Sequence, residues 1–459
     1  MTAPTAAARL SRRVQVGYAT GSLVTGSFGT VPGLLLAPYL TDTLGITAGV
    51  AGLLVLLPKA WDVVVNPLAG RISDRTSGPW GARRPFLLAG GLSLSVLFAA
   101  IFAGFFTGPA GALWVSVAFL LAATGFAFFQ VPYVAMPADM TEAAGLRDEG
   151  GERTRMMTWR VAVLALAILV SGALAPEVRD AFGGGISGHR AMGIFVAGLI
   201  VVGTLLVFFL TRGAPKGAVT QSEHSLRAQL KVASTNRPFR VLVLCFVVQA
   251  AGVAAMLAGV QYFADHVMHD HDAVTLLFVC VVGPAILVMP IWNRVGAWIG
   301  KLKGYVLASL MITGATFALA TAPELPIWAV YAIVGVIGCG YAGQQLFGLA
   351  MLPDCIAYDT IRTGKRQAGV FTGLWTAGET FGLALGPYIF LQTIGLFGYV
   401  PSTTGEAAPQ SSTAELGVLL GFTVVPGIVV GLALLFLRAY KLGPLPGPAG
   451  AEGAAVQAA

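Results

Sequence analysis

Residues 59–85 read KAWDVVVNPLAGRISDRTSGPWGARRP, a segment in which charges interrupt an apolar run that begins near Ile46. A charge facing lipid at that depth would be costly, so these side chains should face the protein interior or a watery cavity. On a helix, Lys59, Asp62 and Asn66 share one face, and Lys59 can neutralise Asp62. The second half carries the basic cluster Arg71, Arg75, Arg83 and Arg84 together with Asp74. The pattern predicts a polar face within a spanning helix, followed by a basic turn at one membrane face.

The composition is that of a polytopic membrane protein. Of the 459 residues, 56% are hydrophobic and 11% are charged, against about 25% charged in soluble domains. The net charge of +7 is spread over many short loops, so no nucleic-acid partner is expected. The four cysteines show no paired or metal-like spacing, and neither a metal nor another cofactor is predicted.

Breaking the chain at charged and Gly/Pro-rich joints gives twelve spans of about 20 or more mostly apolar residues. The predicted fold is all-α and integral to the membrane, with twelve transmembrane helices in two six-helix halves. The predicted spans are 14–40, 46–71, 84–106, 111–137, 157–176, 190–211, 238–264, 273–292, 303–321, 325–352, 367–398 and 413–439. The corresponding domains are an N-terminus (1–13), a first half (14–211), a polar linker (212–237), a second half (238–441) and a tail (442–459) expected to be disordered.

Basic residues are distributed very unevenly between the two membrane sides that this topology predicts. One side collects nearly all of them, and the other has only Arg179 and Arg190. The positive-inside rule predicts that both termini are cytoplasmic in an inner, cytoplasmic membrane. The first span is expected to remain as an uncleaved anchor.

Four ordered sequence blocks carry a family resemblance. The segment WDVVVNPLAGRISDRTSGPWGARRPF resembles the signature WDxxxDPxxGxxxDRTxxxWGRxRP of the glycoside, pentoside and hexuronide cation symporters, the melibiose-permease-like branch of the major facilitator superfamily. Three further blocks resemble that family in the same order, namely VPYVAMPADM (131–140), ERTRMMTWR (152–160) and MLPDCIAYDTIRTGKRQAGVFTGLW (351–375). The resemblance implies alternating-access transport of a small solute coupled to a cation.

By motif position, the resemblance assigns the first cation-binding acid to Asp62, its basic neighbour to Lys59 and a substrate-binding arginine to Arg160. The second acid of the signature is Asn66 here. Because Na⁺ favours several oxygens with net negative charge, this change weakens a sodium site and favours H⁺ over Na⁺ as the coupling ion. Glu379 is a second candidate carboxylate, although Lys59, Asp62 and Glu379 could also serve only helix packing.

The substrate prediction departs further from the family, because the acids that clamp galactosides are missing from the first and fourth helices. The cavity candidates beside Arg160 are mostly neutral or aromatic: Gln130, Tyr133, Gln261, Tyr262, Gln344, Gln345 and Trp375. They suit a glycoside-like solute, or an amphiphile such as those carried by the related lysolipid symporters. Each Gln or Tyr could equally serve helix packing.

A cytoplasmic gate is predicted from mixed charges at the inner helix ends, where ion pairs between the halves could close that face. The predicted gate residues are Asp74, Arg75, Glu152, Arg153, Asp354, Asp359, Arg362, Lys365 and Arg366. Charge placed only for membrane insertion is the alternative.

Several other functions are weighed against symport. An uncoupled facilitator or exporter of the same fold stays open. A membrane-embedded lipid-modifying enzyme would need a catalytic cluster, and only the His/Asp group at 265–272 comes near; a solvated external turn is favoured for it over a metal site. The expected partners are a small-molecule solute and membrane lipids, with the chain as a monomer, and no enzyme activity is expected.

Overall fold

The computed structural model describes residues 10–76, 78–143, 152–215, 234–270, 272–363, 368–404 and 408–442. Every regular element within these ranges is helical, which confirms the all-α fold class. The first bundle contains α1 (Arg12–Ala19), α2 (Ser22–Pro38), η1 (Tyr39–Thr43), α3 (Ala48–Arg75), α4 (Arg84–Ile101), α5 (Gly108–Ala143), α6 (Glu152–Ala181) and α7 (Gly185–Leu210). The second contains α9 (Arg237–Phe263), η3 (Ala264–Met268), α10 (Ala273–Leu287), α11 (Met289–Ile299), α12 (Lys301–Leu319), η4 (Ala322–Glu324), α13 (Ile327–Thr363), α14 (Ala368–Leu396), α15 (Ser412–Phe422) and α16 (Val424–Leu437).

By length and composition, ten helical segments of the described chain could cross a membrane, and α10 with α11 makes an eleventh if that bent pair is one span. The 29-residue α14 is long enough to cross as well. It does not qualify by composition, and it carries the polar residues Glu379 and Gln392. An integral membrane protein is therefore confirmed, and twelve spans stay a prediction.

Two breaks in the spans have local causes. The pair α10 and α11 meets at a bend of 43°, where Pro290 in the first turn of α11 lacks the N–H that a continuous helix would use. The first span breaks near Gly21, between α1 and α2. A Cβ at Gly21 would collide with the Tyr133 ring, so glycine lets α2 and α5 approach closely.

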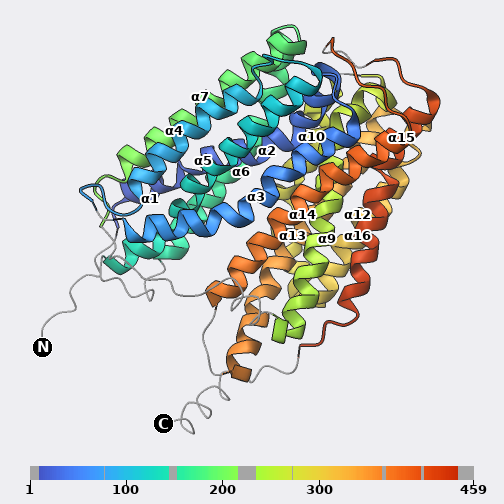
Figure 1. Ribbon diagram of the computed structural model, residues 1–459. Helices are drawn as coiled ribbons and strands as arrows, with labels where there is room; N and C mark the ends of the chain where they lie inside the picture. The colour runs from blue at the N-terminus through green and yellow to red at the C-terminus, as the bar shows by residue number, and fades with distance from the viewer. Residues whose placement is uncertain are drawn as a thin grey trace, which may run out of the picture.

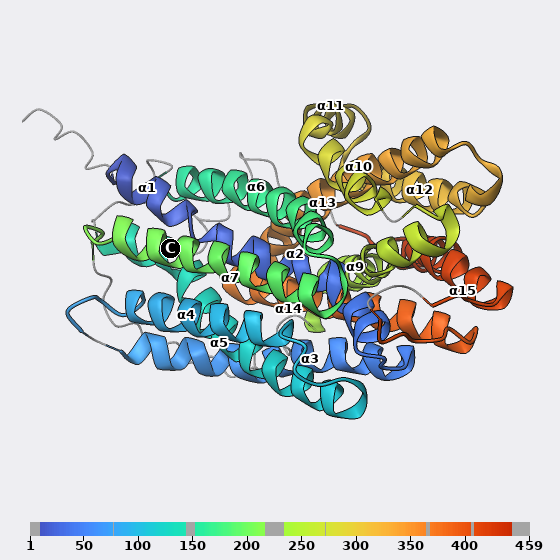
Figure 2. The same ribbon diagram turned by 90° about the horizontal axis from the view of Figure 1, so that it is seen from above.

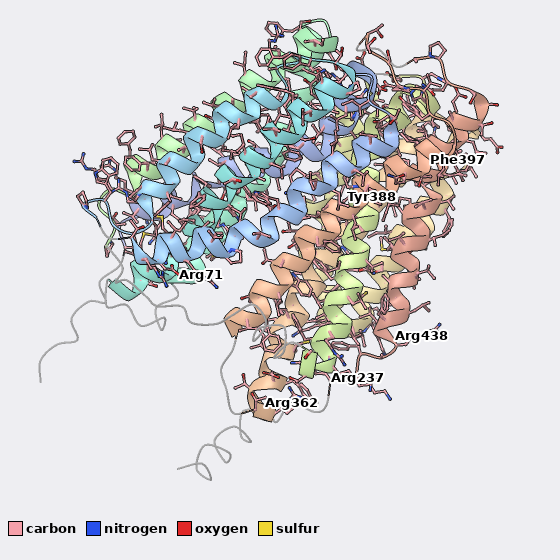
Figure 3. All side chains as sticks on the ribbon, in the orientation of Figure 1. Arg71, Arg237, Arg362, Tyr388, Phe397 and Arg438 are labelled. Atoms are coloured by element: carbon pink, nitrogen blue, oxygen red, sulfur yellow. The ribbon has the colours of Figure 1, made fainter. Side chains whose placement is uncertain are left out.

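The two bundles are joined at one end and spread apart at the other (Figure 1). Arg71, Arg237, Arg362 and Arg438 mark the spread end, which we call the basic end, whereas Phe397 lies at the opposite, far end (Figure 3). Seen from above, α3 and α14 face each other across the interface between the bundles, together with α2 and α9 (Figure 2).

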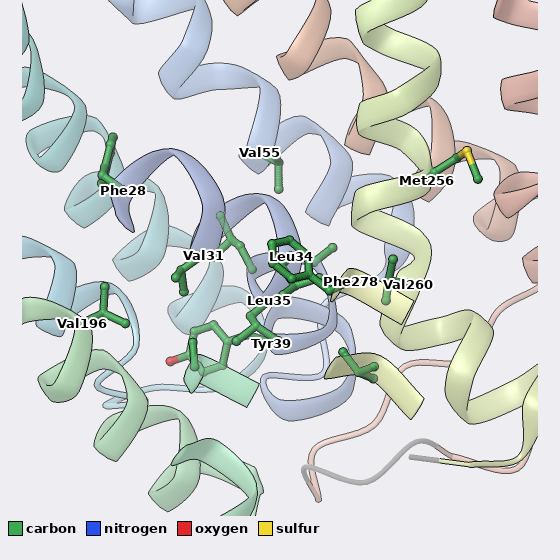
Figure 4. Packing of buried hydrophobic residues seen from close by; sticks show 14 of the residues in the cluster. Phe28, Val31, Leu34, Leu35, Tyr39, Val55, Val196, Met256, Val260 and Phe278 are labelled. Atoms are coloured by element: carbon green, nitrogen blue, oxygen red, sulfur yellow. The ribbon is translucent and has the colours of Figure 1, made fainter. Parts of the chain in front are cut away.

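The largest hydrophobic core crosses this interface. Val31, Leu34 and Leu35 of α2 are fully buried and belong to the same cluster as Met256 and Val260 of α9 (Figure 4). Burial of this apolar surface, at roughly 25 cal/mol per Å², fixes the bundles to each other towards the far end.

Candidate functional site

Lys59 and Asp62 form an ion pair inside the α3 span. The Lys59 Nζ lies 3.8 Å from Asp62 Oδ2 and 5.8 Å from the centre of the Phe28 ring. Asp62 is only 5% exposed, and its Oδ1 atom has no hydrogen-bond partner among the described residues. The spacing prediction therefore holds for this pair, and one carboxylate oxygen is left to receive a proton or ligand.

Asn66 does not join the pair. Its side chain is exposed, and no hydrogen bond involves it in the described part of the chain, while the neighbouring Val65 packs with Ala69 and Ala127. The carboxylate of Asp62 thus has a cation beside it but no second acid or amide.

Arg160 and Tyr133 are in contact in the N-terminal bundle, which also holds Gln130. The Arg160 guanidinium lies over the Tyr133 ring at 5.3 Å. The Tyr133 hydroxyl donates to the Tyr18 carbonyl at 3.0 Å, and Ser22 Oγ donates to the Arg160 carbonyl at 3.0 Å. Arg160 Nε and Gln130 Oε1 are buried without a hydrogen-bond partner in the described residues. These contacts fix the positions of the side chains and leave one donor and one acceptor unused.

A second polar group lies in the C-terminal bundle. Glu379 lines a small pocket with Gln344, Gln345, Tyr341 and Phe246. Gln345 Nε2 donates to the Tyr341 hydroxyl at 2.9 Å. Trp375 stacks on Phe246 with ring centres 4.2 Å apart, and its Nε1 has no partner in the described residues.

Gln344 is committed to packing, since its Nε2 donates to Gln249 Oε1 at 2.5 Å. Gln249 in turn donates to Ser309 Oγ at 2.9 Å. This buried chain joins α13, α9 and α12, so it stabilises the bundle.

Asp62 and Glu379 lie at the same depth on two helices in contact. Near the far end, Gln392 Nε2 of α14 donates to the Gly49 carbonyl of α3 at 3.1 Å. Each carboxylate lies thirteen residues from this contact towards the basic end, about 20 Å along its helix. The two acids therefore lie at matching depths on α3 and α14, two helices in contact across the bundle interface.

Gln261 and Tyr262 lie elsewhere, in a network that joins the bundles at the far end. Tyr262 and Thr41 share a hydrogen bond of 2.7 Å. The Tyr399 hydroxyl donates to Asp42 Oδ1 at 2.8 Å and lies 3.1 Å from His266 Nε2. Because this hydroxyl has one hydrogen, His266 Nε2 must be the donor of the second bond. Burial and the Asp42 carboxylate raise the pKa of Tyr399 far above its ordinary value, so it stays a donor.

Arg179 extends the same network. Its Nη1 donates to Gln261 Oε1 at 2.8 Å, and Gln261 Nε2 donates to Asp265 Oδ2 at 2.8 Å. Together with Asp180 and His189 these residues line a cavity of about 550 Å³. We call the set Thr41, Asp42, Arg179, Gln261, Tyr262, Asp265, His266 and Tyr399 the far-end network.

At the basic end, each ion pair of the described residues joins two residues of the same bundle, and none joins the two bundles. Arg83 pairs with Asp74 at 2.5 Å and with Asp139 at 2.7 Å. Burial opposes the charge of Arg83, but Asp139 and Asp74 raise its pKa overall. In the C-terminal bundle, Lys301 pairs with Asp354 at 2.7 Å and Arg362 with Asp359 at 2.9 Å.

Of the remaining gate residues, only Arg75 has a described side chain, and no ion pair or hydrogen bond involves that side chain within the described residues. Arg75 is exposed. Lys365 and Arg366 lie outside the described residues, as does His271, and the side chains of Glu152 and Arg153 are also outside them. The described part of the chain contains no group of three or more His, Cys, Asp or Glu arranged to hold a metal.

Sequence reasoning missed Asp42, Thr41 and Tyr399, and it placed His266 in a solvated turn, whereas His266 is 7% exposed. One signal was available, because Asp42 is an acid at the end of the first apolar run. Its partner Tyr399 lies 357 residues away, beyond the reach of any local pattern.

Comparison with known proteins supports a membrane transporter. The sequence matches the family described as MFS/sugar transport protein over residues 17–444. It is 26% identical over 449 residues to the uncharacterized symporter YnaJ of Bacillus subtilis, covering 95% of this chain and 92% of that one. It is also 26% identical over 429 residues to the isoprimeverose transporter of Lactiplantibacillus pentosus, covering 91% and 85%.

The fold also resembles solved structures of transporters. The nucleoside transporter NupG superposes with a TM-score of 0.64 at 12% identity, covering 94% of this chain and 99% of that one. A bacterial homologue of the lysosomal transporter Spinster gives a TM-score of 0.67 at 12% identity, covering 93% and 94%.

The helical bundles and their intramembrane charges thus define a multi-pass membrane transporter rather than an enzyme. The chain belongs to the MFS/sugar transport protein family, and the recognition of the glycoside and cation symporters from the sequence blocks is confirmed. One relative, from Escherichia coli, is named as a putative glycoside/cation symporter and is 25% identical over 447 residues.

Proposed function

We propose that the protein is a cation-coupled symporter that carries a glycoside-like solute by alternating access. The observation that carries this proposal is the buried Asp62, paired with Lys59 and left with one unpartnered oxygen inside a spanning helix. Intramembrane acids are costly and mark ion pathways. Two relatives that are named symporters support the same proposal.

We further propose H⁺ rather than Na⁺ as the coupling ion. A proton needs one carboxylate, whereas Na⁺ favours several oxygens with net negative charge. Lys59 neutralises the charge of Asp62, and the Asn66 side chain is exposed and, within the described chain, forms no hydrogen bond with this pair. Glu379, at the same depth on α14, is the second candidate for a protonatable group.

A hydroxyl-rich solute fits the unused polar atoms. Asp62 Oδ1 and Gln130 Oε1 are acceptors, and Arg160 Nε and Trp375 Nε1 are donors. Because buried polar groups are normally hydrogen-bonded, unused ones favour a ligand that supplies partners. Sugar hydroxyls donate and accept, whereas an acyl chain would leave these atoms unpaired.

In this proposal the basic end is cytoplasmic and the far-end network closes the outer face. The ion pairs of Arg83, Lys301 and Arg362 lie within single bundles in this state. We propose that the predicted gate residues exchange partners across the bundles when the inner face closes.

Uptake into proteoliposomes tests the proposal. A panel of glycosides and lysolipids is offered with the proton and sodium gradients imposed separately. Accumulation of a glycoside that follows the proton gradient and is lost in Asp62→Asn supports it. Sodium dependence would overturn the ion assignment, and accumulation of lysolipids alone would overturn the substrate class.

A further inference from the structure

A basic pocket opens at the basic end beside the N-terminal bundle, between the start of α4 and the residues that follow α7. The first turn of α4 supplies Arg84, α5 supplies Asp139, and the chain after α7 supplies Arg212. The other lining residues are Trp80, Gly81, Ala82, Arg83, Met136, Met140, Ala214 and Pro215. None of these residues belongs to the solute site described above.

The arginines of this pocket differ in how their charges are compensated. The charge of Arg83 is compensated, because its Nε donates to Asp139 and its Nη1 donates to Asp74 and Ser73. Arg84 and Arg212 have no carboxylate partner among the described residues. The pocket therefore holds three guanidinium groups against the single carboxylate of Asp139.

Arg84 is held rigidly with donors to spare. Its Nη2 donates to the Phe208 carbonyl at 2.7 Å, and the guanidinium lies over the Phe208 ring at 4.6 Å. Its Nε is buried without a hydrogen-bond partner in the described residues. A planar guanidinium fixed in this way is suited to grip a phosphate oxygen.

The approach to the pocket is apolar. Trp80 is 49% exposed and meets the Phe208 ring edge-on at 5.3 Å. Leu206 and Phe209 are also exposed, on the turn of α7 before Arg212. In a spanning helix such side chains contact acyl chains, and tryptophan concentrates at the headgroup level. The pocket thus combines cations with an adjoining lipid-facing surface, where α4 and α7 lie side by side (Figure 1).

We propose that this pocket binds the phosphate of an anionic phospholipid headgroup, with Arg84 and Arg212 as its ligands and the acyl chains along Leu206 and Phe209. Basic pockets between helices at the cytoplasmic face recognise such headgroups. A soluble anion would share the phosphate contacts but would gain nothing from the apolar approach.

The test is a binding titration with the purified full-length chain in neutral detergent. Phosphatidylglycerol is added, with phosphatidylcholine of the same acyl chains as the neutral lipid, and bound lipid is counted by native mass spectrometry. Arg212→Gln changes an exposed side chain and should leave the fold intact. Arg84→Gln and the double variant follow, with Arg438→Gln as a control that removes an exposed arginine from the same end.

We expect phosphatidylglycerol affinity to fall about fivefold for each arginine removed from the pocket. Arg438→Gln and phosphatidylcholine binding should not change. Equal affinity in Arg212→Gln and the parent would overturn the site, and an equal loss in Arg438→Gln would show a diffuse charge effect instead. Inorganic phosphate that displaces the lipid at matching concentration would overturn the lipid as ligand. Since no solute transport is measured, the outcome is independent of the proposed symport.

Discussion

Replacing Tyr399 by Phe tests whether the far-end network holds the bundles together. The Tyr399 hydroxyl is the donor to the buried Asp42 and also receives a hydrogen bond from His266. The substitution keeps the ring and removes both bonds. When the far end opens, water can solvate Asp42, so the loss falls mainly on the closed state.

The expected magnitude follows from the charge of the acceptor. Hydrogen bonds to charged groups contribute about 1.5–3 kcal/mol, and about 1.4 kcal/mol corresponds to a tenfold change in an equilibrium constant. The ratio of far-end-closed to far-end-open molecules should therefore fall roughly ten- to hundredfold.

Thiol labelling from outside intact cells measures this ratio. Leu257 of α9 faces Gly33 of α2 across the bundle interface, on the basic-end side of the network. With the four native cysteines replaced, Leu257→Cys should react with a membrane-impermeant reagent only when the far end opens. While the open state remains minor, its labelling rate should rise by the same ten- to hundredfold factor in Tyr399→Phe.

Tyr440→Phe is the control, because the Tyr440 hydroxyl lies beside residue 355 within the C-terminal bundle, and its cysteine partner is already replaced in the labelling background. This control also removes one phenolic hydroxyl and leaves the interface between the bundles unchanged. A labelling rate in Tyr399→Phe equal to that of the control would refute the role of the network in closing the far end.

Three further substitutions test the sites within the bundles. Asp62→Asn should abolish gradient-driven accumulation and leave solute exchange, because the coupling carboxylate is lost; full accumulation in transport assays would contradict this role. Arg160→Ala should weaken solute binding about tenfold or more, measured by titration, and unchanged affinity would remove Arg160 from the site. Arg83→Gln should destabilise the protein by roughly 2–3 kcal/mol because Asp74 and Asp139 lose their cation; an unaltered thermal midpoint would argue against this ion-pair hub.

Much of the fold was predictable because a spanning helix can be recognised from a single apolar run of the sequence. The apolar runs gave the helices of both bundles, and the helical spacing of Lys59 and Asp62 gave their ion pair. The breaks were harder to predict. Gly21 is needed because of a ring on α5, and the exposed position of Asn66 depends on how α3 faces its neighbours.

The far-end network could not be predicted in the same way. Gln261 and Tyr262 were predicted as cavity residues, and the other members are ordinary polar residues near helix ends, where a solvated turn is the usual expectation. Their meaning arises only when the bundles meet, which brings Thr41 to Tyr262 and Asp42 to Tyr399. Contacts between separate halves leave no periodic signal in one sequence. Asp62 is recognisable in the sequence because a charged residue within a membrane span is costly and therefore rare.

The positions of Asp62 and Glu379 connect the solute site to the movement of the bundles. A ligand shifts a conformational equilibrium only by its differential affinity for the two states. The helices α3 and α14 are in contact near the far end through Gly49 and Gln392, and they separate towards the basic end (Figure 1). Both acids lie on this diverging part, so a proton or solute bridging them would favour the state in which the helices approach. The most exposed basic-end pair, Lys301 with Asp354, contributes only about 0–1 kcal/mol, too little to set the equilibrium alone. In the proposed function, binding at the two carboxylates is the term that drives the exchange between states.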